Sequence, residues 1–382
     1  MSFEKIGIIK PLLDAIHELG YKKPTTIQSR AISHVLAKKD IFAAAQTGTG
    51  KTAAFLLPSL QRLRHKKILQ PKAVRAIIVS PTRELAVQIE KELLSYVKYM
   101  DISSVLLVGG KSLQTQLKHL KKGVDIAVAT PGRLKEHIIN GSINLKSVEI
   151  FIVDEADRML DMGFVTDLRL LHVELPKNHQ TLLFCATQTE KVRKLSKLIL
   201  KKPIFIETAR QNSATELIDQ QIYLVDKEKK AALLAFLIGS RNMDQVLVFT
   251  KTKQSADTLT DELKLDGLKA DVIHGDKTKA RRNKTLQKFK SKEINVLVAT
   301  DIASRGIDIN GLEQVINFEL PSLKEDYIHR IGRTGRAGNK GEAITLLDDD
   351  DKEQMKHIEK LLHVKILKEE VKGFEKQSKH TR

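Results

Sequence analysis

The sequence predicts an α/β protein with two parallel sheets, each sandwiched between helices. Short runs rich in β-branched residues alternate with segments of helical periodicity throughout the chain. Many of these runs are apolar at every position, which is typical of parallel strands buried on both faces. The chain has 382 residues, more than one ordinary domain holds, so we expect two domains.

Six strands are expected in each half of the chain. Those of the first half cover residues 41–44, 76–80, 105–108, 126–129, 150–153 and 181–184. Those of the second half cover residues 222–224, 246–249, 270–273, 296–299, 314–317 and 342–346. Helical patterns lie between them, for example over residues 86–97 and 256–265, which is the rhythm of βαβ units.

The domain boundary is expected in a polar stretch that follows Pro203. Residues 207–214 have no apolar periodicity, which is typical of a linker. We therefore expect a first domain over residues 1–207, a linker over 208–216 and a second domain over 217–368. The remaining residues, 369–382, are expected to form a short polar tail that frays.

The composition is consistent with a protein that binds a polyanion. The net charge of +18 serves either solubility alone or binding to a polyanion, of which nucleic acid is the commonest. Aromatic residues make up only 4% and Trp is absent, which disfavours a platform of stacked bases. Contacts to the phosphate and sugar backbone, which carry little sequence information, are expected instead.

The sequence also predicts the cellular setting. No apolar run reaches the roughly 18 residues of a membrane span. Residues 1–6 lack the basic and then apolar pattern of a signal peptide. The single cysteine, Cys185, excludes an internal disulfide and a cysteine-based metal cluster. We therefore expect a cytoplasmic protein without membrane contact.

A phosphate loop and an acidic cluster predict hydrolysis of a nucleoside triphosphate. The loop follows the first expected strand and consists of Ala45, Gln46, Thr47, Gly48, Thr49, Gly50, Lys51 and Thr52. Its glycines let backbone N–H groups turn towards phosphates, and Lys51 supplies positive charge to the β and γ phosphates. Asp154, at the tip of a parallel strand, is expected to hold Mg²⁺ together with Thr52, partly through water. Glu155 would orient and deprotonate the attacking water.

These two motifs resemble those of the DEAD-box family of ATP-dependent RNA helicases, whose acidic motif matches Asp154-Glu155-Ala156-Asp157. The motif order and wording are closest to the bacterial RhlE-type subgroup. Phe3 and residues 20–28 match the family's Q motif, and the resemblance implies that Gln28 recognises adenine. Tyr21 and Lys23 would flank the base, although Tyr21 also fits a core aromatic at a helix end.

The second half matches the family's motifs V and VI. Arg333 and Arg336 lie three residues apart, and the resemblance implies that both stabilise the γ phosphate as arginine fingers. We expect them at the start of a helix, and we expect hydrolysis only when the two domains close on ATP. The resemblance further implies ATP contacts for Gly306 and Asp308, RNA contacts for Thr300 and Arg305, and a coupling role for His329.

Further matched loops imply a path for RNA along both domains. Each follows an expected strand, so those of one domain emerge at one edge of its sheet. The implied RNA-binding residues are Arg83, Gly110, Thr130 and Arg133 in the first domain and Thr250, Lys251 and Arg282 in the second. Contacts to 2′-hydroxyl groups would select RNA over DNA.

Two positions depart from the family's usual pattern, Cys185 and Lys279, of which Lys279 stands where the family usually has Gln. Asp157, Cys185 and Thr187 match the residues that couple ATP hydrolysis to strand separation, but the family has Ser where this chain has Cys185. A thiol donates a weaker hydrogen bond than a hydroxyl does, so this coupling is expected to differ.

The resemblance implies two RecA-like (P-loop) domains joined by a short linker, with ATP and Mg²⁺ as cofactors. The expected activity is ATP hydrolysis coupled to local unwinding of short RNA duplexes. Two alternatives are an ATP-gated RNA clamp or ribonucleoprotein remodeller, and a DNA translocase. We expect a monomer, with ribosome-assembly or RNA-turnover factors as partners.

Overall fold

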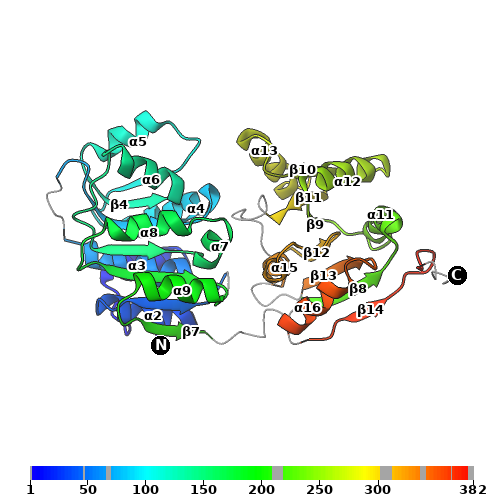
Figure 1. The fold of residues 1–382 in the computed structure, drawn as a ribbon, viewed down its shortest axis with the longest axis horizontal. Helices are drawn as coiled ribbons and strands as arrows, with labels where there is room; N and C mark the ends of the chain where they lie inside the picture. Colours follow the sequence, from blue (N-terminus) through cyan, green and yellow to red (C-terminus); the bar gives the residue numbers. More distant parts are fainter. Residues whose placement is uncertain are drawn as a thin grey trace. The chain divides into compact units, whose positions relative to one another are not determined.

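The computed structural model describes residues 2–45, 48–65, 70–208, 218–301, 312–335, 341–362 and 364–376. By its internal contacts the chain divides into two compact units, residues 1–210 and 211–382. Each unit is an α/β sandwich built around its own sheet (Figure 1). Every helix in the described part of the chain is too short or too polar to cross a bilayer.

The first unit contains a parallel sheet of seven strands in the order β3-β4-β2-β5-β6-β1-β7. These strands are β1 (Ile41–Ala44), β2 (Val74–Val79), β3 (Ser104–Leu107), β4 (Val124–Ala129), β5 (Ile150–Val153), β6 (Gln180–Cys185) and β7 (Ile204–Glu207). The residues of β1, β2, β4, β5 and β6 are buried at every position. This burial confirms the prediction that the continuously apolar runs of the first half form strands covered on both faces.

Helices cover both faces of this sheet. One apolar layer contains residues of α1 (Lys10–Glu18), α2 (Thr26–Leu36), α3 (Lys51–Leu63) and α4 (Arg83–Tyr96). The other contains residues of α5 (Leu113–Leu120), α6 (Pro131–Ile139), α7 (Ala156–Asp161), α8 (Val165–Val173) and α9 (Glu190–Ile199). Alternate residues of a strand enter opposite layers, as Ile41 and Phe42 do.

The sequence analysis missed strand β7. This strand lies at the edge of the sheet beside β1, and Phe205 within it is 69% exposed. The apolar run of residues 204–206 was present in the sequence, but its pairing with β1 joins distant segments of the chain and was not visible there.

The second unit contains a second parallel sheet of seven strands, in the order β10-β11-β9-β12-β13-β8-β14. The strands are β8 (Ile218–Leu224), β9 (Val246–Thr250), β10 (Ala270–Ile273), β11 (Val296–Thr300), β12 (Gln314–Asn317), β13 (Gly341–Leu347) and β14 (Leu367–Glu369). One face packs on α11 (Lys230–Ser240) and α12 (Lys253–Leu265). The opposite face packs on α13 (Lys279–Lys290), α15 (Lys324–Ile331) and α16 (Lys352–Leu362).

The first part of the expected tail, residues 369–376, packs on the second unit. Glu369 is the last residue of β14, which pairs with β8. Beyond it, Phe374 packs against Phe236 of α11 with ring centroids 5.5 Å apart. Lys376 forms an ion pair with Asp349. Two separated apolar residues, Val371 and Phe374, are enough to dock this otherwise polar segment on the core.

Parallel pairing brings the carboxyl ends of the strands of one sheet to one edge. In the first unit this edge carries the loops after β1, β2, β4, β5 and β6, which contain most of the residues singled out from the sequence. Ligands of open α/β sheets bind at this edge.

Candidate functional site

The phosphate loop leads from β1 into α3 with a backbone suited to anion binding. Gly48 and Gly50 have φ values of 81° and 88°, which only glycine adopts readily. Gly50 precedes the first residue of α3, and in the described part of the loop no side chain caps this helix. The free N–H groups and the helix dipole therefore favour a phosphate at this position.

Lys51, the first residue of α3, and Asp154, which follows β5, bring opposite charges to this site. Lys51 is 7% exposed, and its Nζ has no hydrogen-bond partner among the described residues. A buried ammonium group without a partner is costly, so its position fits a phosphate ligand. Burial raises the pKa of the Asp154 carboxyl to about 7, against the opposing effect of the Lys51 charge. Any cation bound beside Asp154 would favour its charged form.

Glu155 has an unusual backbone conformation. Its φ is 53°, in the left-handed region that residues with a side chain rarely adopt. It is the residue before α7, and its Oε2 accepts a hydrogen bond of 2.6 Å from Arg158 Nη1. The strained turn directs the chain from β5 into α7 while the carboxylate is held by an arginine of that helix.

Gln28 joins the Q motif to the phosphate loop. Its Oε1 accepts from the backbone N–H of Thr25, and its Nε2 donates to the carbonyl oxygen of Gly50 at 3.1 Å. A Cβ atom at Gly50 would overlap this amide group, so the close approach requires glycine. The side chain is 2% exposed. Its amide therefore positions the loop, in addition to the adenine contact predicted for it.

Tyr21 belongs to an aromatic cluster beside this motif. Its ring lies 6.1 Å from that of Phe3 and 6.2 Å from that of Tyr96, measured between centroids. Its hydroxyl forms a hydrogen bond of 2.7 Å with the hydroxyl of Tyr96. Tyr21 is partly buried against the core, so the structure gives it the core contacts that the sequence left as an alternative. Lys23 is exposed nearby in the chain.

Asp157 and Thr187 form the contact expected of the coupling motif. Asp157 Oδ2 accepts hydrogen bonds from the backbone N–H groups of Ala186 and Thr187, and from Thr187 Oγ1 at 2.8 Å. The carboxylate thereby ties α7 to the end of β6. Cys185 is fully buried in β6, and its Sγ lies 3.8 Å from the carbonyl oxygen of Ala43 on β1. Burial raises the pKa of this thiol, which stays protonated.

Replacing Cys185 with serine is expected to maintain or increase the number of duplexes unwound per ATP. A hydroxyl at this position donates a stronger hydrogen bond to Ala43, on the strand that leads into the phosphate loop. Parallel assays of ATP hydrolysis and strand displacement measure this ratio, with Cys185→Ala as the control that removes the donor. A clear fall in Cys185→Ser would contradict the interpretation of the thiol as a weakened substitute.

The loops after β2 and β3 meet in the first unit. Arg83, the first residue of α4, lies against Gly109 and Gly110, and a Cβ atom at Gly110 would overlap its guanidinium group. Arg133 of α6 donates to the carbonyl oxygen of Lys111, in the same loop as Gly110, and forms an ion pair with Glu136 at 2.9 Å. Thr130 precedes α6, whose N-terminus has no side-chain cap within the described residues. The predicted RNA contacts of this unit are thus gathered into one region.

The second unit contains a buried network that the sequence analysis missed. Arg330 is 1% exposed and makes a two-pronged ion pair with Asp301, with distances of 2.6 and 2.8 Å. It also donates to Asn317 Oδ1 and to the carbonyl oxygen of Glu319. The Glu319 carboxylate in turn accepts from the backbone N–H of Lys251 at 2.6 Å. Arg330 therefore joins the ends of β9, β11 and β12 to α15.

A sequence signal for Arg330 was present. It lies three residues after Tyr327 and one before Ile331, both fully buried, so helical spacing places it on the inner face of α15.

One expectation for the second unit is corrected by the structure. Arg333 follows α15, which ends at Ile331, so it lies after a helix end and not at a helix start. The side chains of Thr250 and Thr300 are 0% and 6% exposed, and their RNA contacts stay predictions. Arg282 lies on α13 and His329 on α15, both partly buried. Six predicted residues lie outside the described residues, namely Gln46, Thr47, Arg305, Gly306, Asp308 and Arg336.

Comparison with known proteins identifies the family. Residues 25–195 match the DEAD/DEAH box helicase family, and residues 228–338 match the helicase conserved C-terminal domain. The DEAD-box ATP-dependent RNA helicase CshA of Bacillus cereus is 41% identical over 360 residues, which cover 94% of this chain and 68% of the relative. The chain belongs to the DEAD-box ATP-dependent RNA helicases. The helicase RhpA of Helicobacter pylori is 39% identical over 365 residues, covering 96% and 73% of the two chains.

Solved structures of DEAD-box helicases match the same length of chain. S. cerevisiae Dbp5 bound to RNA and ADP BeF3 matches with a TM-score of 0.84 and 30% identity, covering 97% of this chain and 95% of that one. Mss116p bound to single-stranded RNA and AMP-PNP matches with a TM-score of 0.84 and 32% identity, covering 97% and 78%. This DEAD-box protein is an RNA-dependent ATPase with two RecA-like domains. The RhlE-type subgroup stays a prediction.

Proposed function

We propose that the helicase hydrolyses ATP at the edge of the first sheet, with Lys51, Asp154 and Glu155 as its catalytic residues. The single observation that supports this assignment is the buried ammonium of Lys51, without a hydrogen-bond partner among the described residues, under an uncapped helix N-terminus. The ammonium group of Lys51 and the dipole of α3 both stabilise negative charge on phosphates, which is the main requirement of phosphoryl transfer. Gln28 is proposed to recognise the adenine, and Tyr21 and Lys23 are proposed to flank it.

The residues beside the phosphate loop fit a magnesium ion. Mg²⁺ prefers oxygen ligands and is held by one or two carboxylates together with substrate phosphates. Asp154 provides a buried carboxylate, and Thr52, at the second position of α3, provides a hydroxyl. When bound, the ion would neutralise charge on the phosphates. The protein's own contribution is to hold the Asp154 side chain, whose Oδ1 accepts from the backbone N–H of Glu155 at 3.0 Å.

Glu155 is the proposed general base for the attacking water. A carboxylate removes a proton from water only if it is charged and oriented. The ion pair with Arg158 supports both conditions, because the guanidinium stabilises the charged form and fixes one carboxylate oxygen. Arg333 and Arg336 stay predicted as the arginines that stabilise charge on the γ phosphate.

RNA is proposed to bind the first unit near the loops after β2, β3 and β4. Arg83 and Arg133 can approach phosphates, and α6 offers an uncapped N-terminus. In the second unit the proposed contacts are Lys251, Arg282 and the backbone near Thr250 and Thr300. The net charge of +18 adds attraction that depends on salt but not on RNA sequence. RNA-bound relatives support this partner, whereas ribosome-assembly factors and a cytoplasmic location stay predictions.

The decisive test is the rate of ATP hydrolysis with single-stranded RNA, with single-stranded DNA and with neither. We expect RNA alone to stimulate turnover strongly, with stimulation falling as salt rises. An equal response to DNA would support a DNA translocase instead. Strand displacement on a short RNA duplex then separates an unwinding enzyme from an ATP-gated clamp, which would bind RNA without releasing a strand.

A further inference from the structure

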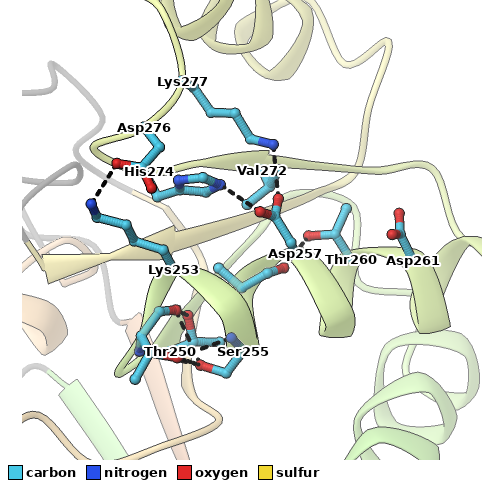
Figure 2. A network of polar contacts seen from close by, with 12 residues as sticks. Thr250, Lys253, Ser255, Asp257, Thr260, Asp261, Val272, His274, Asp276 and Lys277 are labelled. Carbon is cyan, nitrogen blue, oxygen red and sulfur yellow. Dashed lines mark hydrogen bonds and ion pairs between the residues drawn. The ribbon is translucent and has the colours of Figure 1, made fainter.

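The turn between β10 and α13 is held by two oppositely charged residues of a single helix. Lys253 and Asp257 lie four residues apart on α12, so they project from the same face. Lys253 Nζ contacts Asp276 Oδ1 at 2.5 Å, and Asp257 contacts two basic residues of the turn (Figure 2). Each side therefore contributes both signs of charge: the basic residue of the helix contacts an acidic residue of the turn, and the acidic residue of the helix contacts two basic residues of the turn.

Asp257 uses both of its carboxylate oxygens. Oδ2 lies 2.9 Å from His274 Nε2, and Oδ1 lies 2.8 Å from Lys277 Nζ. His274 is 3% exposed at the end of β10, whereas Lys277 is partly exposed on the other side of Gly275 and Asp276. Burial acts against ionisation of Asp257, but its close contacts with Lys277 and His274 outweigh this effect and hold the pKa of the carboxyl below its usual value. The carboxylate therefore spans the turn from its first residue to its fourth.

The turn leads directly into the helix that carries Arg282. Thr278 caps α13 by accepting a hydrogen bond from the N–H of Arg281 at 3.2 Å. Asp271 of β10 holds the same helix through Arg281 at 3.1 Å and Thr285 at 2.9 Å. Residues 279–290 contain six basic and no acidic residues. Two carboxylates, Asp257 and Asp271, thus fix where this basic helix begins.

From this geometry we propose that Asp257 is a positioning residue for RNA binding by the second unit. It fixes the turn of residues 274–278 and the start of α13, so that Arg282 and the backbone near Gly275 meet the RNA phosphates. This inference rests on the proposed RNA contact of Arg282.

The negative charge of Asp257 allows a positioning role to be distinguished from a purely electrostatic one. Asp257 has a side chain that is 44% exposed, so beside a phosphate path its negative charge alone repels RNA. A purely electrostatic role therefore predicts tighter RNA binding after its removal. A positioning role predicts weaker binding, because Lys277 and the turn lose their anchor although a negative charge has gone.

The test compares Asp257→Asn with Asp261→Asn, a matched control on the next turn of α12 (Figure 2). Asp261 is 76% exposed and pairs only with Lys264 of its own helix among the described contacts. For Asp257→Asn we expect the RNA concentration that half-saturates ATPase stimulation to rise roughly tenfold. A change of this size corresponds to the loss of one hydrogen bond to a charged group. The maximal rate should change by less than about twofold. Asp261→Asn should leave both values unchanged or bind RNA slightly more tightly.

Further measurements separate positioning from a loss of stability. The affinity for a fluorescent single-stranded oligouridylate should fall in parallel. The melting temperature should change little, because the Asp257 carboxylate is 44% exposed and solvent weakens its ion pairs. Since Asp257 acts partly through His274, the double variant with His274→Gln should bind RNA no more weakly than Asp257→Asn alone. Unchanged or tighter RNA binding in Asp257→Asn, or independent effects in the double variant, would overturn the proposal.

A third variant distinguishes failure of this inference from failure of the RNA assignment. Arg282→Ala should weaken RNA binding at least as much as Asp257→Asn does. If Arg282→Ala has no effect, the proposed RNA contact of α13 is wrong, and the positioning role is wrong with it. If Arg282→Ala weakens binding and Asp257→Asn does not, only the positioning role is wrong.

Discussion

Replacing Glu155 with glutamine is expected to slow ATP turnover by a factor of about 10² to 10⁴, the usual contribution of a general base. Glutamine keeps the shape of the side chain and can still orient a water, but it cannot accept the proton. ATP should still bind, because Lys51 and the N-terminus of α3 are unchanged. Single-turnover hydrolysis and binding of a fluorescent ATP analogue measure the two effects separately.

A matched control is Glu190→Gln in the same unit. Glu190 is an exposed residue of α9 that pairs with Lys194, so its replacement should leave turnover unchanged. Since Glu155→Gln also weakens the ion pair with Arg158, its melting temperature should be compared with that of the parent protein. Turnover within tenfold of the parent in a correctly folded Glu155→Gln would show that another group removes the proton.

Replacing Arg330 with methionine is expected to destabilise the second unit by about 3–5 kcal/mol, the usual cost of breaking a buried ion pair. Methionine fills part of the volume but leaves Asp301 and Asn317 without the donor they share. It also removes the contact of the guanidinium with the Phe249 ring, 4.9 Å from its centroid. Hydrogen exchange of the amides in β9, β12 and α15 measures the loss locally.

The control for this effect is Lys292→Met. Lys292 and its partner Asp244 are more than half exposed, so this ion pair should contribute less than about 1 kcal/mol. Exchange in the first unit serves as an internal reference, since the described contacts of Arg330 lie within the second unit. Equal exchange rates for Arg330→Met and the parent protein would mean that the network does not contribute to folding.

Much of the fold could be predicted because the central strands are buried on both faces. Residues 41–44, 150–153, 270–273 and 314–317 were predicted with the bounds that the structure has. Strand β7 was missed because its apolar run, residues 204–206, is short and its pairing with β1 is not a local property. Strand β14 was missed because it is exposed at every position and has no apolar run. The acidic and phosphate-loop motifs were recognisable because they combine several rare requirements in a short segment.

Contacts between distant segments were beyond the sequence. No local pattern indicated that Gln28 supports Gly50, that Arg83 lies against Gly110, or that Arg330 is buried with Asp301. Each of these pairs is formed by residues from different elements, and the spacing within one element cannot reveal them.

The two α/β domains and the family could be recognised, and the residues of the ATP site predicted, from the sequence, because apolar periodicity and short motifs are local properties of a chain. The folded structure was needed to show which polar side chains are buried or bonded within the protein. Lys51 is buried with no partner among the described residues, whereas Thr250 and Arg330 are enclosed and Asp257 is bound to the turn that precedes α13. That division depends on burial and on partners far away in the chain, because a buried polar group must find a partner and the fold determines which one it meets.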